Sequence, residues 1–204
     1  MTQYKLGHSI IFEHTMAEHG LKRFQTSIYV AIEDPDENLL AIFTGCAISP
    51  AHPWYFTNFV YNDKVFKDAE IAIFYAKAIM FNDKVTGKKI LKANSIEMAY
   101  NLAKTINGYN EDIWKQKSED IVYRIMKRKL KKNFNWLKHT ENSIIGILIN
   151  NKFSALAPEW YININPDDIT KLNYNKLEEY GENLLGKTLM RIRNELNKKY
   201  DISL

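Results

Sequence analysis

Hydrophobic and polar positions follow the clearest pattern between Asp68 and Asp83. From Ile71 to Phe81 every residue except Lys77 is apolar or aromatic, so this segment has no polar face to turn toward solvent. A helix that is apolar all round is a buried helix. The pattern therefore predicts a buried helix with Asp68 as its N-cap, and it places Lys77 in the core.

A buried ammonium group needs a partner, because an isolated charge in a low-dielectric interior is strongly disfavoured. Glu70 precedes Lys77 by seven positions, about two turns of helix, so both side chains are expected on one side. A carboxylate beside an amine suits an acid/base group next to a nucleophile that forms a Schiff base with a sugar aldehyde. The alternative is a lysine whose stem packs in the core while its ammonium group reaches the surface.

Three later segments repeat apolar residues at helical spacing. Residues 90–106 predict one or two helices, and residues 118–134 and 181–199 predict one each. Gly87 is interpreted as the break after the buried helix, and Asn183 as the N-cap of the last helix. The inward face of the 118–134 helix is expected to consist of Ile121, Val122, Ile125, Met126 and Leu130.

Short β-prone runs flank turn residues at two places. Residues 26–33 and 39–43 predict a hairpin around a Pro-containing turn, and residues 54–61 and 64–66 predict a second, aromatic hairpin that leads into the buried helix. The apolar run 144–149 fits either a helix or a strand. We therefore expect an α+β fold, a mainly α-helical single domain with small β hairpins.

Composition narrows the class of protein. The chain has 204 residues, of which 46% are apolar and 25% charged, as in soluble globular proteins. The single Cys46 cannot form an internal disulfide and the five histidines are scattered, so neither a metal site nor a cofactor is expected. The N-terminus lacks the hydrophobic region of a signal peptide, and no apolar run approaches a membrane span, so we expect a cytoplasmic protein without a membrane partner.

Positive charge gathers in residues 124–132, which hold six cations within nine positions. Such a run can follow a phosphate backbone, and the net charge of +4 permits a polyanionic partner. The alternative is a solvated helix face whose cations are favoured by the helix dipole. The candidate nucleic-acid contacts are Arg124, Lys127, Arg128 and Lys131.

Taken in chain order, several motifs resemble those of the NADAR family, named for NAD and ADP-ribose metabolism. The family's Phe-Ser-Asn-Phe resembles Phe56-Thr57-Asn58-Phe59, and its helix with Glu and Lys followed by an aromatic residue and Asp is matched by Glu70, Lys77, Phe81 and Asp83. A later Trp, Met and Lys-x-Phe pattern is matched by Trp114, Met126, Lys132 and Phe134. The closing Gly-x-Asn-x-Leu-Gly-x-x-Leu-Met-x-x-Arg is matched by Gly181, Asn183, Leu185, Gly186, Leu189, Met190 and Arg193.

The resemblance implies a mainly helical α+β domain that hydrolyses an N-glycosidic bond to an ADP-ribose or ribose-phosphate unit. One branch of the family is similar to enzymes that remove ADP-ribose from guanine in nucleic acid, and another cleaves early intermediates of riboflavin biosynthesis. Carried over, Lys77 would capture C1 of the ribose and Glu70 would be the acid/base. The substrate contacts implied in the same way are Phe56, Asn58, Trp160, Gly181, Asn183 and Gly186.

We therefore expect an ADP-ribosyl glycohydrolase acting on ADP-ribosylated nucleic acid, DNA foremost, as a repair or counter-defence factor against a DNA-modifying toxin, for example in a phage. A hydrolase of small ribosylated phosphates and a non-catalytic ADP-ribose binding module are the alternatives. Residues 1–53 are expected to form an N-terminal extension of the same compact unit, with residues 54–204 as the NADAR-like catalytic domain. The chain departs from the family where Glu159 and Tyr161 flank Trp160, since the family has Asp and Gly there.

Overall fold

The computed structural model describes residues 6–7, 30–33, 39–44, 57–131, 144–147, 154–162 and 174–201. The helices of this part are α1 (Ala69–Met80), α2 (Lys84–Leu91), α3 (Ile96–Ala103), α4 (Glu111–Leu130) and α6 (Leu184–Asp201), with 3-10 turns at Pro158–Trp160 and Tyr174–Glu179. The strands are β1 (Leu6–Gly7), β2 (Val30–Glu33), β3 (Leu39–Thr44), β4 (Phe59–Tyr61), β5 (Lys64–Phe66) and β6 (Ile144–Ile147). The expected α+β, mainly helical fold is confirmed.

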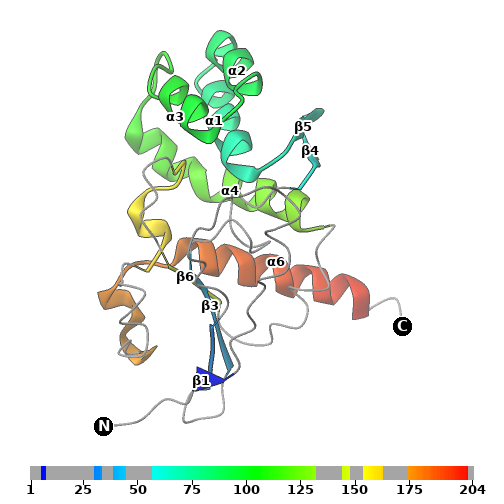
Figure 1. Ribbon diagram of the computed structural model, residues 1–204, viewed down its shortest axis with the longest axis vertical. Helices are drawn as coiled ribbons and strands as arrows, with labels where there is room; N and C mark the ends of the chain where they lie inside the picture. Colours follow the sequence, from blue (N-terminus) through cyan, green and yellow to red (C-terminus); the bar gives the residue numbers. More distant parts are fainter. Residues whose placement is uncertain are drawn as a thin grey trace.

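The elements form a helical upper part and a lower sheet. In Figure 1, α1, α2 and α3 cluster above α4, and α6 lies below α4. Helix α6 contacts α4 and also β6. The described helices include none that is both long and apolar enough to cross a bilayer.

The sheet order is β1-β2-β3-β6. Strands β2 and β3 are antiparallel, so the predicted first hairpin is confirmed. Strand β6 pairs in parallel with β3, in register from Ala41 with Ile144 to Thr44 with Ile147. The apolar run after residue 143 is therefore a strand, and it joins the sheet formed by the first 53 residues.

The second hairpin, β4–β5, is also confirmed in its described part. Strands β4 and β5 pair around Asn62 and Asp63, whose φ angles of 46° and 57° are those of a two-residue turn of the kind that matches strand twist. The rings of Phe59 and Phe66 lie 5.9 Å apart on the buried side. The hairpin thereby delivers the chain into the start of α1.

Helix α1 is the centre of the described core, as the apolar pattern predicts. The carboxylate of Asp68 accepts a hydrogen bond from the backbone N–H of Ile71 at 2.8 Å, so the predicted N-cap is confirmed. Ala72 and Ile73 are completely buried. Apolar side chains lie on several sides of α1, and α2, α3 and α4 pack against them.

The interpretation of Gly87 as a helix break is wrong, because Gly87 lies inside α2. A Cβ atom at this position would lie 3.0 Å from Cδ1 of Ile79, so glycine allows α2 to pack closely against α1. The chain turns earlier, at Asn82, whose φ is 59°. Asp83 then caps α2 by accepting the N–H of Thr86 at 2.9 Å.

Helix α4 begins earlier than residue 118. Asn110 caps it by accepting the N–H of Ile113 at 3.0 Å, and Trp114 lies in its first turn. The predicted inward face is confirmed, since its five members are all buried: Ile121, Val122, Ile125, Met126 and Leu130. Periodicity located the apolar face but missed the polar first turns, in which Asn110 supplies the start signal.

Candidate active site

Lys77 lies on the last turn of α1 and is half-buried among aromatic side chains. Its Nζ donates a hydrogen bond to Oη of Tyr109 at 3.4 Å. The same atom lies 4.6 Å from the ring centroid of Tyr109 and 4.7 Å from that of Trp114. Burial lowers the pKa of Lys77, and the negative charge of Glu111 partly opposes this shift. A lysine with a lowered pKa is more often neutral, which a nucleophile requires.

Tyr109 is held above Lys77 by two neighbours. Its ring meets Phe81 edge to face, with centroids 5.2 Å apart, and its hydroxyl donates to the carboxylate of Glu111. Burial and the nearby Glu111 both raise the pKa of Tyr109, so the hydroxyl keeps its proton. Lys77, Tyr109 and Glu111 therefore form one connected polar group at the N-terminal end of α4.

Asp83 fixes the loop that carries Tyr109. One carboxylate oxygen caps α2, and the other accepts the backbone N–H of Asn107 at 3.0 Å. These hydrogen bonds lower the pKa of Asp83 to about 2. The carboxylate thus joins the end of α1 to a loop 24 residues further along the chain, two residues before Tyr109.

Glu70 has different surroundings, although it shares α1 with Lys77. Its side chain is 0% exposed. Its Oε1 accepts the hydroxyl hydrogen of Ser154 at 3.0 Å, and its Oε2 accepts the backbone N–H of Ala155 at 2.6 Å. The Ser154 hydroxyl also lies 3.4 Å from Oη of Tyr161. Glu70 therefore anchors the segment around Ser154 to the first turn of α1.

Lys129 corrects the expected basic face of α4. Lys129 belongs to the basic run 124–132, for which either a phosphate-binding or a solvated face is expected, but its side chain is 0% exposed. Lys129 follows Ile125 by four positions and Met126 by three, which places it on the inward face. Burial lowers the pKa of Lys129 to about 7, and the carboxylates of Asp68 and Glu70 oppose this shift. Helical spacing alone could have revealed this buried lysine.

The two ends of α1 therefore carry two polar environments. Glu70 and Lys77 are separated by a rise of about 10 Å along the helix axis. The charge acting on the pKa of Lys77 is that of Glu111, whereas Glu70 acts on Lys129 and on Tyr161. The lysine adjoins a cage of aromatic rings, and the glutamate lies inside a buried hydrogen-bonded cluster.

The other expected substrate contacts lie in different surroundings. Asn58 is exposed immediately before β4, and Trp160 is only 3% exposed within the core. Gly186 is buried in the first turn of α6. Phe56 lies outside the described residues.

The chain before α6 has an unusual backbone. Gly181 has a φ of 146°, and a Cβ atom there would lie within 3.3 Å of the carbonyl carbon of Tyr161 and closer still to its oxygen. Asn183 has a φ of 50°, and its carbonyl accepts the N–H of Lys187 at 3.0 Å. Asn183 directly precedes α6 and accepts its first helical hydrogen bond, so it occupies the expected N-cap position, with a left-handed backbone in place of the usual extended one. Gly181 thereby allows the segment before α6 to lie against the backbone of Tyr161.

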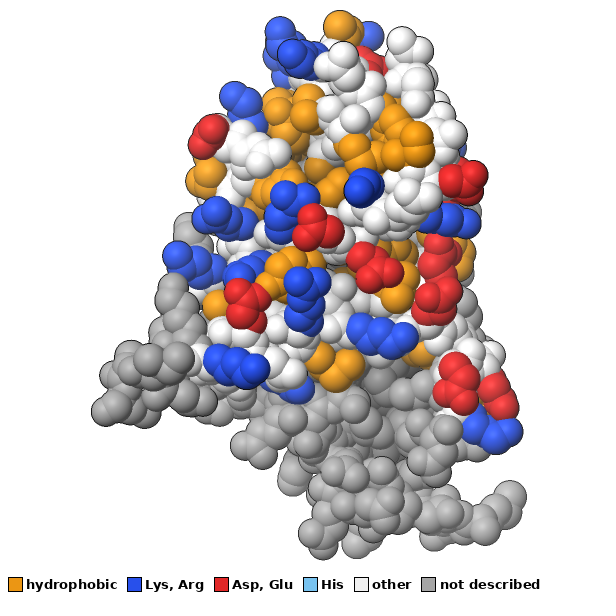
Figure 2. All heavy atoms as spheres, turned by 180° about the vertical axis from the view of Figure 1, so that it is seen from behind, with side chains coloured by type: hydrophobic (Ala, Val, Ile, Leu, Met, Phe, Trp, Pro, Cys, Tyr) orange, Lys and Arg blue, Asp and Glu red, His pale blue; other side chains and the backbone are white. Residues whose placement is uncertain are grey.

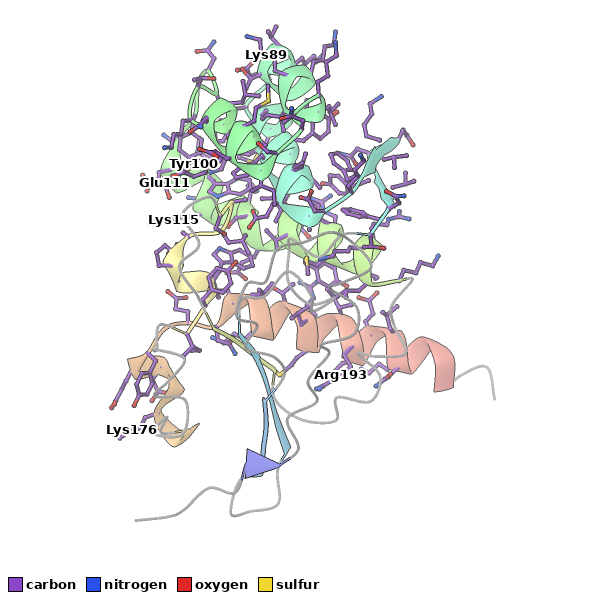
Figure 3. The ribbon with its side chains drawn as sticks, in the orientation of Figure 1. Lys89, Tyr100, Glu111, Lys115, Lys176 and Arg193 are labelled. Carbon is purple, nitrogen blue, oxygen red and sulfur yellow. The ribbon has the colours of Figure 1, made fainter. Side chains whose placement is uncertain are left out.

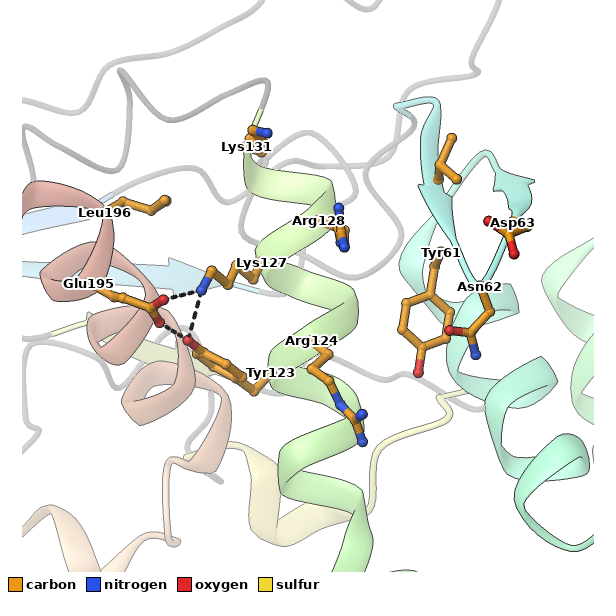
Figure 4. A pocket seen from close by; sticks show the side chains of 11 residues that line it. Tyr61, Asn62, Asp63, Tyr123, Arg124, Lys127, Arg128, Lys131, Glu195 and Leu196 are labelled. Atoms are coloured by element: carbon orange, nitrogen blue, oxygen red, sulfur yellow. Dashed lines mark hydrogen bonds and ion pairs between the residues drawn. The ribbon is translucent and has the colours of Figure 1, made fainter. Parts of the chain in front are cut away.

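The remaining candidates line a groove of about 820 Å³ between the C-terminal half of α4, the β4–β5 hairpin and α6. Figure 4 shows Arg124 and Arg128 on the hairpin side of α4 and Lys127 directed toward α6. Lys127 is paired with Glu195 of α6. Arg124 pairs with Asp120 at 2.6 Å. All four expected cations line this groove, which Lys131 completes.

Charges of both signs lie on the described surface seen from behind. In the view from behind, Lys and Arg side chains alternate with Asp and Glu across the described surface (Figure 2). Within the part of the chain that the structure describes, no group of three or more His, Cys, Asp or Glu residues is placed to hold a metal ion. The four cations near the C-terminal end of α4 therefore line a local groove and are not part of a uniformly basic face.

Comparison with known proteins defines the family. The NADAR domain matches residues 33–197, which is most of the chain and includes both ends of α1. The chain belongs to the NADAR family. A relative named as an N-glycosidase, from Acanthamoeba polyphaga mimivirus, is 28% identical over 119 residues, covering 58% of this chain and 68% of the relative. The domain match begins in β2, within the segment expected to be an extension.

Proposed function

We propose that this protein is a hydrolase that removes ADP-ribose from guanine bases of nucleic acid. Membership of the NADAR family and the N-glycosidase relative support a glycosidase-type hydrolase. The observation that carries the proposal is the amine of Lys77, which is half-buried, has a lowered pKa and lies against two aromatic rings. An amine in this state can attack a sugar carbon, and aromatic faces can stack on a base.

The reaction can be written with all bonds and protons accounted for. The neutral amine of Lys77 attacks C1 of the ribose, and the bond from C1 to the guanine nitrogen breaks. The electron pair leaves with the guanine nitrogen, which takes one amine proton. The second amine proton goes to the ring oxygen as the ribose opens, giving an imine between C1 and Lys77. Water then adds to C1, which releases ADP-ribose and restores the amine.

Glu70 acts in this proposal through Ser154, because its own side chain has no exposed surface. The Ser154 hydroxyl is half-buried and donates its hydrogen to the Glu70 carboxylate. A proton can pass along this hydrogen bond to or from a group that contacts Ser154. Glu70 is thereby the acid/base group for the addition of water to C1, and Ser154 is its link to the substrate.

The experiment compares three proteins on guanine-ADP-ribosylated DNA. Wild type should release ADP-ribose, Lys77→Ala should not, and Lys115→Ala should behave as wild type. Lys115 is the matched control because it is exposed at the end of α4 that contacts Lys77 (Figure 3). Its replacement by alanine removes one positive charge, as Lys77→Ala does. Borohydride added during turnover should trap an adduct on Lys77. Full activity of Lys77→Ala would exclude the assigned nucleophile.

A small ribosylated phosphate is the second candidate substrate. It is favoured by the distance along α4 between Lys77 and the basic groove. Lys77 adjoins Trp114 near the start of α4, whereas the basic groove is lined by the last residues of the helix. A small substrate at Lys77 would leave the groove empty. Its cleavage would depend little on salt concentration, whereas cleavage of nucleic acid held by several phosphates should weaken steeply with salt.

The third candidate is a module that binds ADP-ribose without cleaving it, because Tyr161 stands where the family has a glycine after its Trp. Tight binding of ADP-ribosylated DNA with no product after long incubation would favour this reading. If cleavage occurs, the same activity would serve to reverse the modification left by an ADP-ribosylating toxin.

A further inference from the structure

The basic groove lies far from Lys77 along α4. Trp114, which contacts Lys77, and Arg128, which lines the groove, are 14 positions apart, a rise of about 21 Å. Figure 3 places Glu111 and Lys115 at the end of α4 away from the β4–β5 hairpin. The groove therefore cannot hold the same nucleotide as the aromatic cage around Lys77.

The groove has the charge and form of a site that binds the phosphate backbone of a nucleic acid. Four cations and two carboxylates, Asp63 and Glu195, are among its lining residues, so positive charge prevails. Arg124 and Arg128 are one helical turn apart and follow one edge of the groove (Figure 4). Cations in a row along a groove are the arrangement that follows consecutive phosphates of one strand. An acidic peptide is the other class of polyanion with the charge to bind such a groove.

Glu195 opposes anion binding in the groove. Its carboxylate pairs with Lys127 and accepts the hydroxyl hydrogen of Tyr123, and Lys127 also lies 3.3 Å from that hydroxyl. Lys127 is thus held against α6, as the dashed lines of Figure 4 show. Arg128 and Lys131 follow Lys127 toward the C-terminal end of α4, and both are exposed.

We infer that this groove binds the phosphate backbone of the nucleic-acid strand about six nucleotides away from the base at Lys77, and that Glu195 limits the affinity by occupying Lys127. The spacing follows from the rise along α4 and from about 3.4 Å per stacked nucleotide. The inference rests on the proposed function. Beyond that function, it adds a second contact site for the strand, at a fixed distance from the reacting base. It also adds Glu195 of α6 as a residue that lowers the affinity of this site.

Binding tests the groove without any cleavage. The probe is an unmodified, fluorescein-labelled single-stranded oligodeoxynucleotide of roughly 16 nucleotides, followed by anisotropy over a range of salt concentrations. Arg128→Ala/Lys131→Ala should weaken binding and reduce the slope of log affinity against log salt by about 1.4, since each lost phosphate contact removes about 0.7. Lys88→Ala/Lys89→Ala, on exposed positions of α2, removes the same charge and should leave the slope unchanged.

Glu195→Gln gives the sharper result, because it predicts a gain. Glutamine still accepts the Tyr123 hydroxyl but no longer neutralises Lys127, so binding should tighten and the slope should increase by about 0.7. The inference is overturned if Glu195→Gln binds no more tightly than wild type and the Arg128/Lys131 variant matches the α2 control. It is equally overturned if polyglutamate binds the groove and the oligonucleotide does not.

Cleavage then tests the distance. Wild type should turn over a guanine-ADP-ribosylated strand with more than about six flanking nucleotides faster than ADP-ribosylated guanosine, and this ratio should fall in Arg128→Ala/Lys131→Ala. An unchanged ratio would overturn the assigned spacing. If wild type cleaves neither substrate, the proposed function fails, whereas the salt slopes of wild type and the three variants still decide whether the groove binds a strand.

Discussion

The sharpest structural prediction concerns Gly181, which lies between Tyr161 and the start of α6. Its φ of 146° is one that residues with a side chain rarely adopt, and a Cβ atom there would press into the backbone carbonyl of Tyr161. A side-chain rotation cannot relieve this overlap, because the obstacle is the backbone carbonyl of Tyr161. Gly181→Ala must therefore move the chain on one side or the other.

The magnitude has two parts. Forcing alanine into such a backbone conformation costs about 1–3 kcal/mol, and relieving the overlap by a backbone shift adds about 1–3 kcal/mol. Alanine also restricts the unfolded chain, which returns about 0.4–1 kcal/mol. We expect a net loss of about 3 kcal/mol in the free energy of unfolding. For a domain of this size the melting temperature should fall by roughly 6–12 °C.

Gly108→Ala is the matched control. Gly108 also has a positive φ, 70°, but a Cβ atom there meets nothing within 4 Å. This variant has the conformational cost without the overlap and should lose about 1 kcal/mol or less. Urea unfolding followed by tryptophan fluorescence measures both, since Trp114 and Trp160 are buried. Equal losses in the two variants would refute the argument from the Tyr161 backbone.

Three further predictions concern titratable groups. Hydrogen bonds lower the folded pKa of Asp83 to about 2, so its contribution to stability is present above the unfolded pKa and is lost as the pH falls from about 4 to 2; Asp83→Asn should remove this loss in acid unfolding curves. Burial lowers the folded pKa of Lys129 to about 7, so between about pH 7 and pH 10 the unfolded chain holds a proton that the folded protein lacks, and stability should rise with pH. Lys129→Met should flatten that rise in urea unfolding at a series of pH values, and an unchanged slope would contradict the buried assignment. Glu70→Gln retains an acceptor for the Ala155 N–H, so it should alter the pH profile of turnover more than the thermal unfolding curve. A variant that unfolds without any change in pH profile would reduce Glu70 to a structural anchor.

Local patterns in the sequence determined most of the helices and both hairpins. The apolar run after Asp68 predicted α1 and its burial, and the turn at Asn62 and Asp63 predicted β4–β5. These features depend on neighbours within a few residues, through capping, side-chain periodicity and backbone preference. The family motifs likewise single out Glu70 and Lys77 from the sequence alone.

Contacts between distant segments were decided only by the tertiary structure. The sequence left the apolar run 144–149 open between helix and strand, and pairing of residues 144–147 with β3 made them a parallel strand. Tyr109 meets Lys77 from 32 residues away, and Ser154 meets Glu70 from 84 residues away. No local pattern encodes such encounters, because packing of α4 and the loops against α1 brings the groups together.

The basic run shows both contributions in one helix. Composition identified its cations, and helical spacing was sufficient to place Lys129 inward with Ile125 and Met126. Only the packing of α4 against α1 and α6 determined the partners, giving Lys129 the buried carboxylates and Lys127 the carboxylate of Glu195. Periodicity fixes which face a residue occupies, whereas its charge environment depends on what the rest of the chain packs against that face.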